Sequence, residues 1–445
     1  MKLDPSIFHP DYKPEPYWWE LARPGTYFAG DLPTATEVLV IGSGYAGLSA
    51  ALELARNGRT VAVLDAQAFG EGASSRSGGG ISAGTNLGKG IAGGPGQEKL
   101  ASEQTALLEK LLAESLAAFE FLLHLIERER IDCKLEINGR FVGAYSKAHF
   151  DGLRKKAEQL NRLLNVRAEL VTPAEQRAEI ASDFYFGGMT IERAGKLHPS
   201  LLHKGMLESC HNAGVTLCAN AEVLKIVGSK GNFRLDTALG PCRAEQIVIA
   251  TNGYTGDLTP NLRKRLVPIR SQIIATEELP SDLTRMLMPR GRTISETARI
   301  TCYYRLLPGD RRVMFGGRAR FHDIPADRSA ILLHDMMTER LPQLKGCRIM
   351  HSWSGLVAMT HDSLAHMGEI DGYHYCAGCN GSGIAMMTYL GYQVARKIIQ
   401  NGHSDCAFDA LDFPRIPVPF YRGEPWFLPI VGEYFRHLDR RDRRA

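Results

Sequence analysis

Near the start of the chain, the spacing of apolar and polar positions predicts a strand, a tight turn, a helix and a second strand. An apolar run at 38–41 precedes a glycine-rich turn at 42–47. Apolar residues then recur at helical spacing over 48–57, and a further apolar run ends at Asp65. This order is typical of the β-α-β unit that opens a Rossmann-like fold.

Two later apolar runs predict that the chain returns to this sheet after a long excursion. The run at 244–250 is followed by Thr251-Asn252-Gly253, and a strand pattern at 373–376 leads into a second glycine-rich turn. A helical run at 385–399 follows that turn. Because ligands gather at the carboxyl ends of such strands, both turns are candidate binding elements.

The residues between the first β-α-β unit and the second glycine-rich turn also predict a second domain built on a β-sheet. It contains a leucine-striped helical pattern from Glu98 to about Arg130 and β-like runs at 266–276, 300–307 and 312–317. The predicted fold is therefore α/β: a discontinuous Rossmann-like domain with an α+β second domain. The expected division is a wrapping segment at 1–35, the Rossmann-like domain at 36–100, 188–268 and 345–405, the second domain at 101–187 and 269–344, and a tail at 406–445.

Composition changes this picture little. The 445 residues are 44% hydrophobic and 23% charged with a net charge of +4, which is ordinary for a globular protein and argues against nucleic acid or an anionic membrane as partner. We see no signal peptide and no apolar run long enough to cross a bilayer. Nine scattered cysteines predict reduced thiols and a cytoplasmic location.

The turn at 42–47 has the chemistry of a dinucleotide site. Gly42 allows the sharp turn, Gly44 lets the backbone approach a pyrophosphate, and Gly47 lets the helix pack closely on the strand. The helix N-terminus offers free N–H groups to the phosphates. Asp65 lies 23 positions after Gly42, where an acid is expected to hold a ribose hydroxyl. This motif alone fits NAD as well as FAD.

The glycine- and serine-rich passage at 70–80, which continues to Gly96, has two interpretations. Its composition is that of a flexible linker. It also directly follows the second strand, where a long cofactor continues beyond its ribose, and Arg76 adds a cation there. We favour cofactor contact, because small residues let a chain lie flat against a ring system.

Two other patterns are interpreted as structural. Cys376 and Cys379 have the C-x-x-C spacing, but no thioredoxin-like unit surrounds them and only His374 stands near as a third zinc ligand, so we predict no metal site. The arginine cluster at 436–444 is interpreted as a solvated tail.

Taken together, these motifs resemble those of a known family. The turn at 42–47, the passage at 72–79, the run at 250–254 and the turn at 378–383 occur in this order in flavin-dependent amine oxidases. The chain resembles the D-amino acid oxidase superfamily, and within it the gamma-glutamylputrescine oxidoreductase group. The likeness extends from about Tyr17 beyond Phe408 and is more specific for cofactor and fold than for substrate.

The resemblance implies that the cofactor is FAD, so that the Rossmann-like domain binds FAD and the second domain binds substrate. Asp65 would hold the adenosine ribose in place of a more usual glutamate, and the Val223 backbone would contact adenine. The implied FAD-binding residues are Gly42, Ser43, Gly44, Tyr45, Ala46, Gly47, Asp65, Ala66, Ala73, Ser74, Ser75, Arg76, Ser77, Gly78, Gly79, Val223, Ala250, Thr251, Gly253, Asn380, Gly381, Ser382, Gly383 and Ile384.

The chain departs from relatives that attach flavin covalently. It has no cysteine between Cys347 and Cys376, and 78–80 offer no histidine, so we expect noncovalent FAD. Ala365 and His366 replace a commoner proline and aliphatic residue, which leaves the substrate open. No catalytic residue is assigned. The substrate-pocket candidates are Tyr304, Trp353, Ser354 and His361.

The implied reaction is oxidation of the C–N bond of a small amine or amino acid, possibly gamma-glutamylputrescine-like. A neutral amine would give hydride to the flavin, the imine would hydrolyse, and oxygen would be the acceptor and yield hydrogen peroxide. The alternatives are a flavin dehydrogenase that passes electrons to another acceptor, a flavoprotein subunit without turnover, and a nicotinamide dehydrogenase. The oligomeric state is left open.

Overall fold

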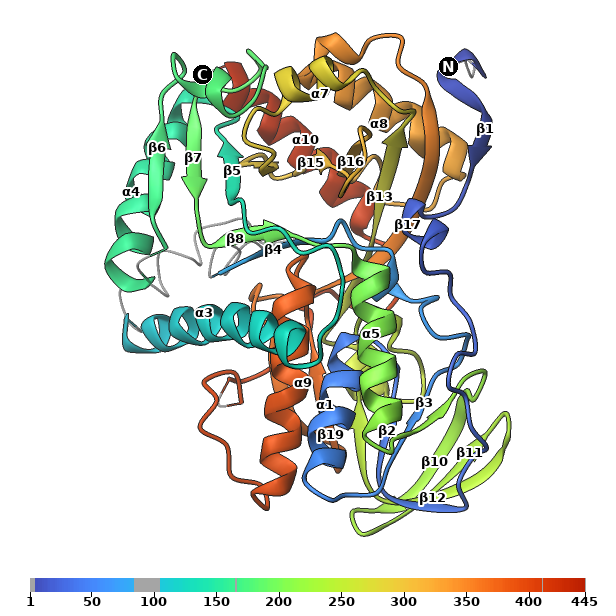
Figure 1. The fold of residues 1–445 in the computed structure, drawn as a ribbon. Coiled ribbons are helices and arrows are strands. Elements are labelled where there is room, and N and C mark those ends of the chain that lie inside the picture. Colours follow the sequence, from blue (N-terminus) through green and yellow to red (C-terminus); the bar gives the residue numbers. More distant parts are fainter. Residues whose placement is uncertain (1–4, 84–104, 165, 410, 445) are drawn as a thin grey trace.

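The computed structural model describes residues 5–83, 105–164, 166–409 and 411–444. Its two halves, one above the other in Figure 1, are each built on a sheet.

Sheet I, in the lower half of Figure 1, is the predicted Rossmann-like sheet. Its central strands β12, β2, β3 and β9 run parallel, and β19 adds to β12 in the same direction. Among the described residues it has eight strands, β2 (Ala35–Ile41), β3 (Val61–Leu64), β9 (Thr216–Cys218), β10 (Val223–Ser229), β11 (Asn232–Thr237), β12 (Gly240–Ile249), β18 (His366–Ile370) and β19 (Tyr373–Ala377).

Sheet II, in the upper half, is mainly antiparallel. Among the described residues it has nine strands, in the spatial order β1-β17-β13-β16-β15-β14-β5-β7-β6. They are β1 (Phe8–Lys13), β5 (Arg140–Gly143), β6 (Ala168–Val171), β7 (Gly188–Ile191), β13 (Val267–Thr276), β14 (Thr293–Glu296), β15 (Tyr303–Leu306), β16 (Val313–Gly317) and β17 (Ile349–Met359). A small pair, β4 (Gly80–Ser82) and β8 (Ala194–Lys196), lies between the halves (Figure 1).

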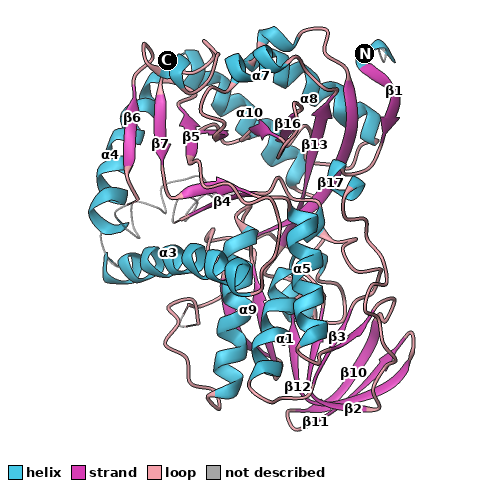
Figure 2. Cartoon of the chain, viewed as in Figure 1, coloured by secondary structure: helices cyan, strands magenta, loops and turns pink. Residues whose placement is uncertain are grey.

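Helices cover one face of sheet I, as Figure 2 shows. Those nearest the sheet have long buried stripes; α1 buries Leu48, Leu52 and Leu54 against the apolar side chains of β2 and β3. The described helices are α1 (Tyr45–Arg56), α3 (Thr105–Arg128), α4 (Lys147–Leu164), α5 (Pro199–Asn212), α6 (Pro260–Arg263), α7 (Ser281–Leu287), α8 (Ala326–Arg340), α9 (Gly383–Ile399) and α10 (Leu428–Arg444).

The strand pairings differ from the expected domain boundaries at 188 and 345. Strands β7 and β17 both belong to sheet II, although their residues fell in ranges assigned to the Rossmann-like domain. Helix α3, assigned to the second domain, packs on α9 of the first half, with the rings of Phe121 and Tyr392 4.6 Å apart. The helix was expected from Glu98, and its described part begins at Thr105.

The two ends of the chain are also more ordered than expected. The segment at 1–35 was expected to wrap the body rather than build a sheet, but β1 pairs with β17 as the edge strand of sheet II. The arginine-rich end was expected to be a solvated tail, but it forms α10. There Asp439 is 6% exposed and the Arg443 guanidinium lies 3.9 Å from the Phe184 ring centre.

Candidate active site

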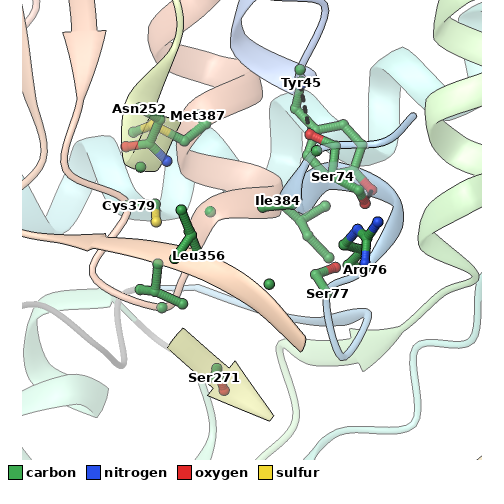
Figure 3. Close-up of a pocket in the computed structure, with 18 of the residues that line it drawn as sticks. Tyr45, Ser74, Arg76, Ser77, Asn252, Ser271, Leu356, Cys379, Ile384 and Met387 are labelled. Carbon is green, nitrogen blue, oxygen red and sulfur yellow. Dashed lines mark hydrogen bonds between the residues drawn. The ribbon is translucent and has the colours of Figure 1, made fainter. Parts of the chain in front are cut away.

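A large cavity of about 1320 Å³ lies between the two sheets and is lined from both. Most residues of the implied FAD-binding set line it, whereas Gly47 and Ser75 lie behind its wall. Those that line it are 42–46, Asp65, Ala66, Ala73, Ser74, 76–79, Val223, Ala250, Thr251, Gly253 and 380–384. Figure 3 shows side chains that enter it from each half, Tyr45 and Ser74 from one and Ser271 on β13 from the other.

The first glycine turn holds β2, α1 and the end of β12 in close contact. Gly42 has φ +104°, and a Cβ there would lie 2.9 Å from the carbonyl oxygen of Ala250. A Cβ on Gly47 would lie only 1.9 Å from the carbonyl oxygen of Gly42. Gly44, in contrast, would place a Cβ 3.2 Å from Ser74 Oγ and near no other atom. Gly42 and Gly47 thus serve chain packing, and Gly44 leaves space on the cavity side.

Asp65 holds the same turn from the end of β3. Its Oδ2 accepts hydrogen bonds from the Ser43 amide at 3.0 Å and the Ser43 hydroxyl at 2.5 Å, and its Oδ1 accepts from the Gln67 amide at 3.0 Å. These contacts fix the carboxylate at the cavity wall. Its expected contact with a ribose remains a prediction.

Three tryptophans anchor the loop at 75–77, which carries Arg76 into the cavity. The indole N–H groups of Trp18 and Trp353 donate to the carbonyl oxygens of Ser77 and Arg76 at 2.9 and 2.8 Å. The third, Trp19, donates to Ser75 Oγ at 2.9 Å, and the Arg76 guanidinium lies 4.5 Å from its ring centre. The loop is therefore held rigidly and is not a flexible linker. Its continuation to Gly96 extends beyond the described residues.

The second glycine turn is braced by Asn380, which has φ +45°. Its Oδ1 accepts from the Thr360 amide at 3.0 Å, and its Nδ2 donates to the carbonyl oxygens of Gly378 and Leu364 at 2.8 and 3.0 Å. Helix α9 then begins at Gly383, and its N-cap residue Ser382 makes no side-chain capping bond.

The C-x-x-C cysteines have free thiols and lie at the end of β19 and on this turn. Cys376 is fully buried in β19, and burial raises the pKa of its thiol to about 12. Cys379 lines the cavity, and Figure 3 shows its sulfur there. Among the described residues, no group of three or more His, Cys, Asp or Glu side chains could hold a metal ion.

Of the four substrate-pocket candidates, only Tyr304 lines the cavity. Its hydroxyl lies 2.8 Å from that of Tyr185, and burial raises the pKa of Tyr304. Trp353 anchors the loop as described above. The Ser354 hydroxyl lies 3.3 Å from an Arg270 guanidinium nitrogen, and His361 is exposed at the surface.

The lining from sheet II includes residues that were not among the expected site residues. Ser271, Tyr303 and Arg318 reach the cavity from β13, β15 and the end of β16. Phe435 of α10 also lines it. Ser271, Tyr303 and Arg318 come together only through strand pairing. The one local sequence feature that could have indicated their position is the Gly316-Gly317 pair. A Cβ on Gly316 would lie 2.4 Å from the Tyr303 ring, so glycine there makes space for that ring.

The residues present fit FAD. Helices α1 and α9 both begin at the cavity, so their positive dipole ends favour an anionic ligand there; the first amide of α1, that of Tyr45, donates to Ser74 Oγ at 3.2 Å. The glycines that line the cavity between them leave a smooth surface. A Cβ on Gly381, for example, would meet no atom of the described residues within 4 Å. Residues 42–46 would hold the pyrophosphate, and 76–79 with 380–384 would surround the ring system.

Comparisons with known proteins agree with this geometry. Residues 37–397 match the family model DAO, described as FAD dependent oxidoreductase. The chain is 30% identical to gamma-glutamylputrescine oxidoreductase of Escherichia coli (strain K12) over 410 residues, which cover 92% of this chain and 93% of that protein. It is 25% identical to glycine oxidase of Geobacillus kaustophilus (strain HTA426) over 394 residues, 85% of this chain and 96% of that protein.

Solved structures share the fold. The crystal structure of glycine oxidase from Geobacillus kaustophilus matches with a TM-score of 0.71 at 20% identity, covering 87% of this chain and 100% of that one. L-proline dehydrogenase from P. horikoshii matches with a TM-score of 0.67 at 19% identity, covering 89% and 98%. No helix within the described ranges is long and apolar enough to cross a membrane.

Proposed function

Because the chain belongs to the DAO family of FAD dependent oxidoreductases, we propose that it binds FAD noncovalently and oxidises the C–N bond of a small amine or amino acid. The observation that carries the proposal is the cavity, which joins the N-termini of α1 and α9 to a polar pocket on sheet II. The full-length likeness to gamma-glutamylputrescine oxidoreductase supports an amine as substrate. When bound, FAD supplies the acceptor for a hydride from the carbon next to the amine.

The chain's own residues orient the substrate and exclude water. Ser271 and Tyr303 offer hydroxyls 3.0 Å apart, while Ile273, Met314 and Leu356 give the same pocket apolar walls. Burial raises the pKa of Tyr303, so its phenol stays neutral and can donate or accept a hydrogen bond. A reacting amine held between these groups would approach the cofactor in a fixed orientation, which is the main contribution a protein makes to such a reaction.

An amine panel tests the activity. Purified holoprotein is mixed anaerobically with each amine, and loss of the oxidised flavin absorbance marks a substrate. We expect at least one amine or amino acid, with gamma-glutamylputrescine among those tried, to bleach the flavin. Readmission of air with detection of hydrogen peroxide then identifies oxygen as acceptor. A flavin that no amine bleaches would count against the proposed reaction.

Acid precipitation tests the mode of attachment. The chain has no cysteine between Cys347 and Cys376, so we expect all flavin to appear in the supernatant as FAD. Flavin that remains in the pellet would show a covalent bond. The nine free thiols are consistent with the reducing, cytoplasmic location that we propose.

A further inference from the structure

Three aromatic residues lie directly behind the wall of the cavity. Tyr17, Trp18 and Trp353 belong to one buried apolar cluster with Ile273 and Met314, and these last two also line the cavity. The indoles are well buried, with Trp18 0% and Trp353 4% exposed. The strand register explains the contact, because Trp353 of β17 lies opposite Ile273 of β13. The aromatic rings therefore pack against residues that would face a bound cofactor.

The three rings form a chain that leads away from the cavity wall. At its inner end, the Trp353 indole N–H donates at 2.8 Å to the carbonyl oxygen of Arg76, which lines the cavity. The ring centres of Trp353 and Trp18 are 6.3 Å apart, and those of Trp18 and Tyr17 are 5.7 Å apart. Rings at these separations are in edge-to-face contact. Because electron exchange between aromatic rings falls off steeply with distance, these contacts offer an electron a fast route through the cluster.

The outer end of the chain can release a proton as well as an electron. The Tyr17 hydroxyl donates a hydrogen bond of 2.6 Å to Asp310 Oδ2, in the turn between β15 and β16. Burial, followed by this bond, raises the pKa of Tyr17, so the resting phenol keeps its proton. A phenol that loses one electron becomes a strong acid, and the Asp310 carboxylate is placed to accept its proton. Tyr17 can therefore be oxidised to a neutral radical.

A nearby arginine favours movement of an electron vacancy from Trp18 to Tyr17. The guanidinium of Arg305 lies 5.0 Å from the Trp18 ring centre. Its charge repels the positive charge that an indole carries after it loses one electron. Tyr17 carries no such charge once its proton lies on Asp310. An electron vacancy on Trp18 therefore passes on to Tyr17.

We propose that Trp353, Trp18 and Tyr17 form an electron-transfer chain that protects the cofactor site from damage by light. The oxidant is light-excited FAD, so the proposal rests on the proposed function for its cofactor. Trp353 gives one electron to the excited FAD, and Trp18 then refills Trp353. Tyr17 refills Trp18 and gives its proton to Asp310, so one electron has moved from Tyr17 to FAD. Return of that electron to Tyr17, with the proton from Asp310, restores the resting state and releases the light energy as heat.

A pulse of blue light tests the end of the chain. FAD-loaded wild type, Tyr17→Phe and Tyr389→Phe are compared by transient absorption, which separates the narrow band of a tyrosine radical from the broad band of a tryptophan radical. Tyr389 is the matched control, because its hydroxyl also donates to a carboxylate, that of Glu114, and it lies outside the aromatic cluster and the cavity wall. We expect Tyr17→Phe to lose the tyrosine radical and keep the tryptophan radical, and Tyr389→Phe to match wild type.

Fluorotryptophan tests the middle of the chain without breaking its hydrogen bonds. Fluorination makes an indole harder to oxidise but keeps the N–H groups with which Trp18 and Trp353 hold the loop at 75–77. We expect protein grown with fluorotryptophan to form less of the Tyr17 radical than wild type. Trp18→Phe should abolish this radical in the molecules that retain FAD. Trp426→Phe is the control, because Trp426 is 59% exposed and outside the cluster, and it should match wild type.

Steady blue light in air tests the protective role. Without Tyr17 the indoles stay oxidised for longer, so Tyr17→Phe should accumulate oxygenated Trp18 and Trp353 faster than wild type and Tyr389→Phe, as measured by mass spectrometry. A tyrosine radical that survives Tyr17→Phe, an unchanged radical yield with fluorotryptophan, or equal damage in the three proteins would overturn the proposal. Protein that oxidises amines but forms no Tyr17 radical contradicts this proposal alone, whereas protein that takes up no FAD contradicts the proposed function as well.

Discussion

Gly44 and Gly47 stand three residues apart in one turn, but their missing side chains serve different purposes. A Cβ on Gly47 would clash with the Gly42 carbonyl at 1.9 Å, whereas a Cβ on Gly44 would meet only Ser74 Oγ at 3.2 Å. We therefore expect Gly47→Ala to destabilise the fold by about 1–3 kcal/mol or more. We expect Gly44→Ala to keep the stability of the apoprotein but to lose FAD affinity, because its methyl group enters the space of the pyrophosphate.

Urea unfolding of the two apoproteins and fluorescence titration with FAD measure these effects separately. Each variant is the control for the other, because the chemical change is the same. Equal losses of stability in the two variants would mean that both glycines serve only the packing of the turn.

His198 packs against Trp18, which anchors the loop at 75–77, and its protonation makes the stability of the fold depend on pH. It is 1% exposed, its ring centre lies 4.9 Å from that of Trp18, and its Nδ1 accepts from the Leu201 amide at the start of α5. Burial, with a smaller contribution from the Arg305 charge, lowers its pKa to about 4. The unfolded chain therefore binds a proton at this imidazole below pH ~6.5, whereas the folded chain binds it only near pH 4. Because the unfolded state binds more protons between these values, the free energy of unfolding falls as the pH falls from 6.5 to 4.

The variant His198→Asn keeps an N-cap side chain but cannot titrate. We expect the free energy of unfolding of wild type to drop more than that of His198→Asn between pH 6.5 and 4, by an amount on the order of 2–3 kcal/mol. Urea melts across this pH range measure the difference. Parallel pH profiles for the two proteins would rule out this role for His198.

At the scale of the element, one buried carboxylate of α10 bonds to the loop between β14 and β15 of sheet II. Asp439 accepts hydrogen bonds from the backbone amides of Arg299 and Ile300 at 3.1 and 3.0 Å, and Phe435 of the same helix lines the cavity. We expect Asp439→Ala to cost about 1–3 kcal/mol, because it leaves both amides without an acceptor. Hydrogen exchange at the Ile300 amide should accelerate, and KM should rise as the wall at Phe435 loosens.

Asp442→Ala is the matched control on the same helix. Its carboxylate meets only side chains, the Arg299 guanidinium at 2.6 Å among them, so it should leave exchange at Ile300 almost unchanged. Protection at Ile300 that survives Asp439→Ala would show that the helix is held by its apolar face alone.

The elements also show why the sequence predicted one side of the site better than the other. The residues at 42–47, Asp65 and 378–384 sit in strand-turn-helix units, where local spacing alone specifies the geometry. Ser271, Tyr303 and Arg318 meet only because β13, β15 and β16 pair in one register, and no local pattern encodes that register. For the same reason the sequence did not place β17 in sheet II, and its residues were assigned to the Rossmann-like domain.

At the scale of the whole molecule, the cavity is the junction of the two halves. FAD that occupies it would bind only the native state, so the unfolding midpoint should rise with FAD concentration, by about 2.7 kcal/mol of stability at one hundred times the Kd. Trp18, Trp19 and Trp353 all contact the loop at 75–77, so tryptophan fluorescence reports on this junction directly. A midpoint that does not depend on FAD would contradict the proposed cofactor site.

The tryptophan anchor has a consequence for how the protein matures during synthesis. Trp353 follows Arg76 by 277 residues, and β1 pairs with β17. During synthesis, β1 and the loop at 75–77 therefore leave the ribosome well before the strand that carries their late partners. At ribosomal speeds this interval is on the order of tens of seconds, during which the loop at 75–77 lacks the hydrogen bond from Trp353 to the Arg76 carbonyl oxygen. We therefore expect FAD to bind late, after β17 has left the ribosome. Stalled nascent chains that end before β17 should not retain FAD, whereas released full-length chains should.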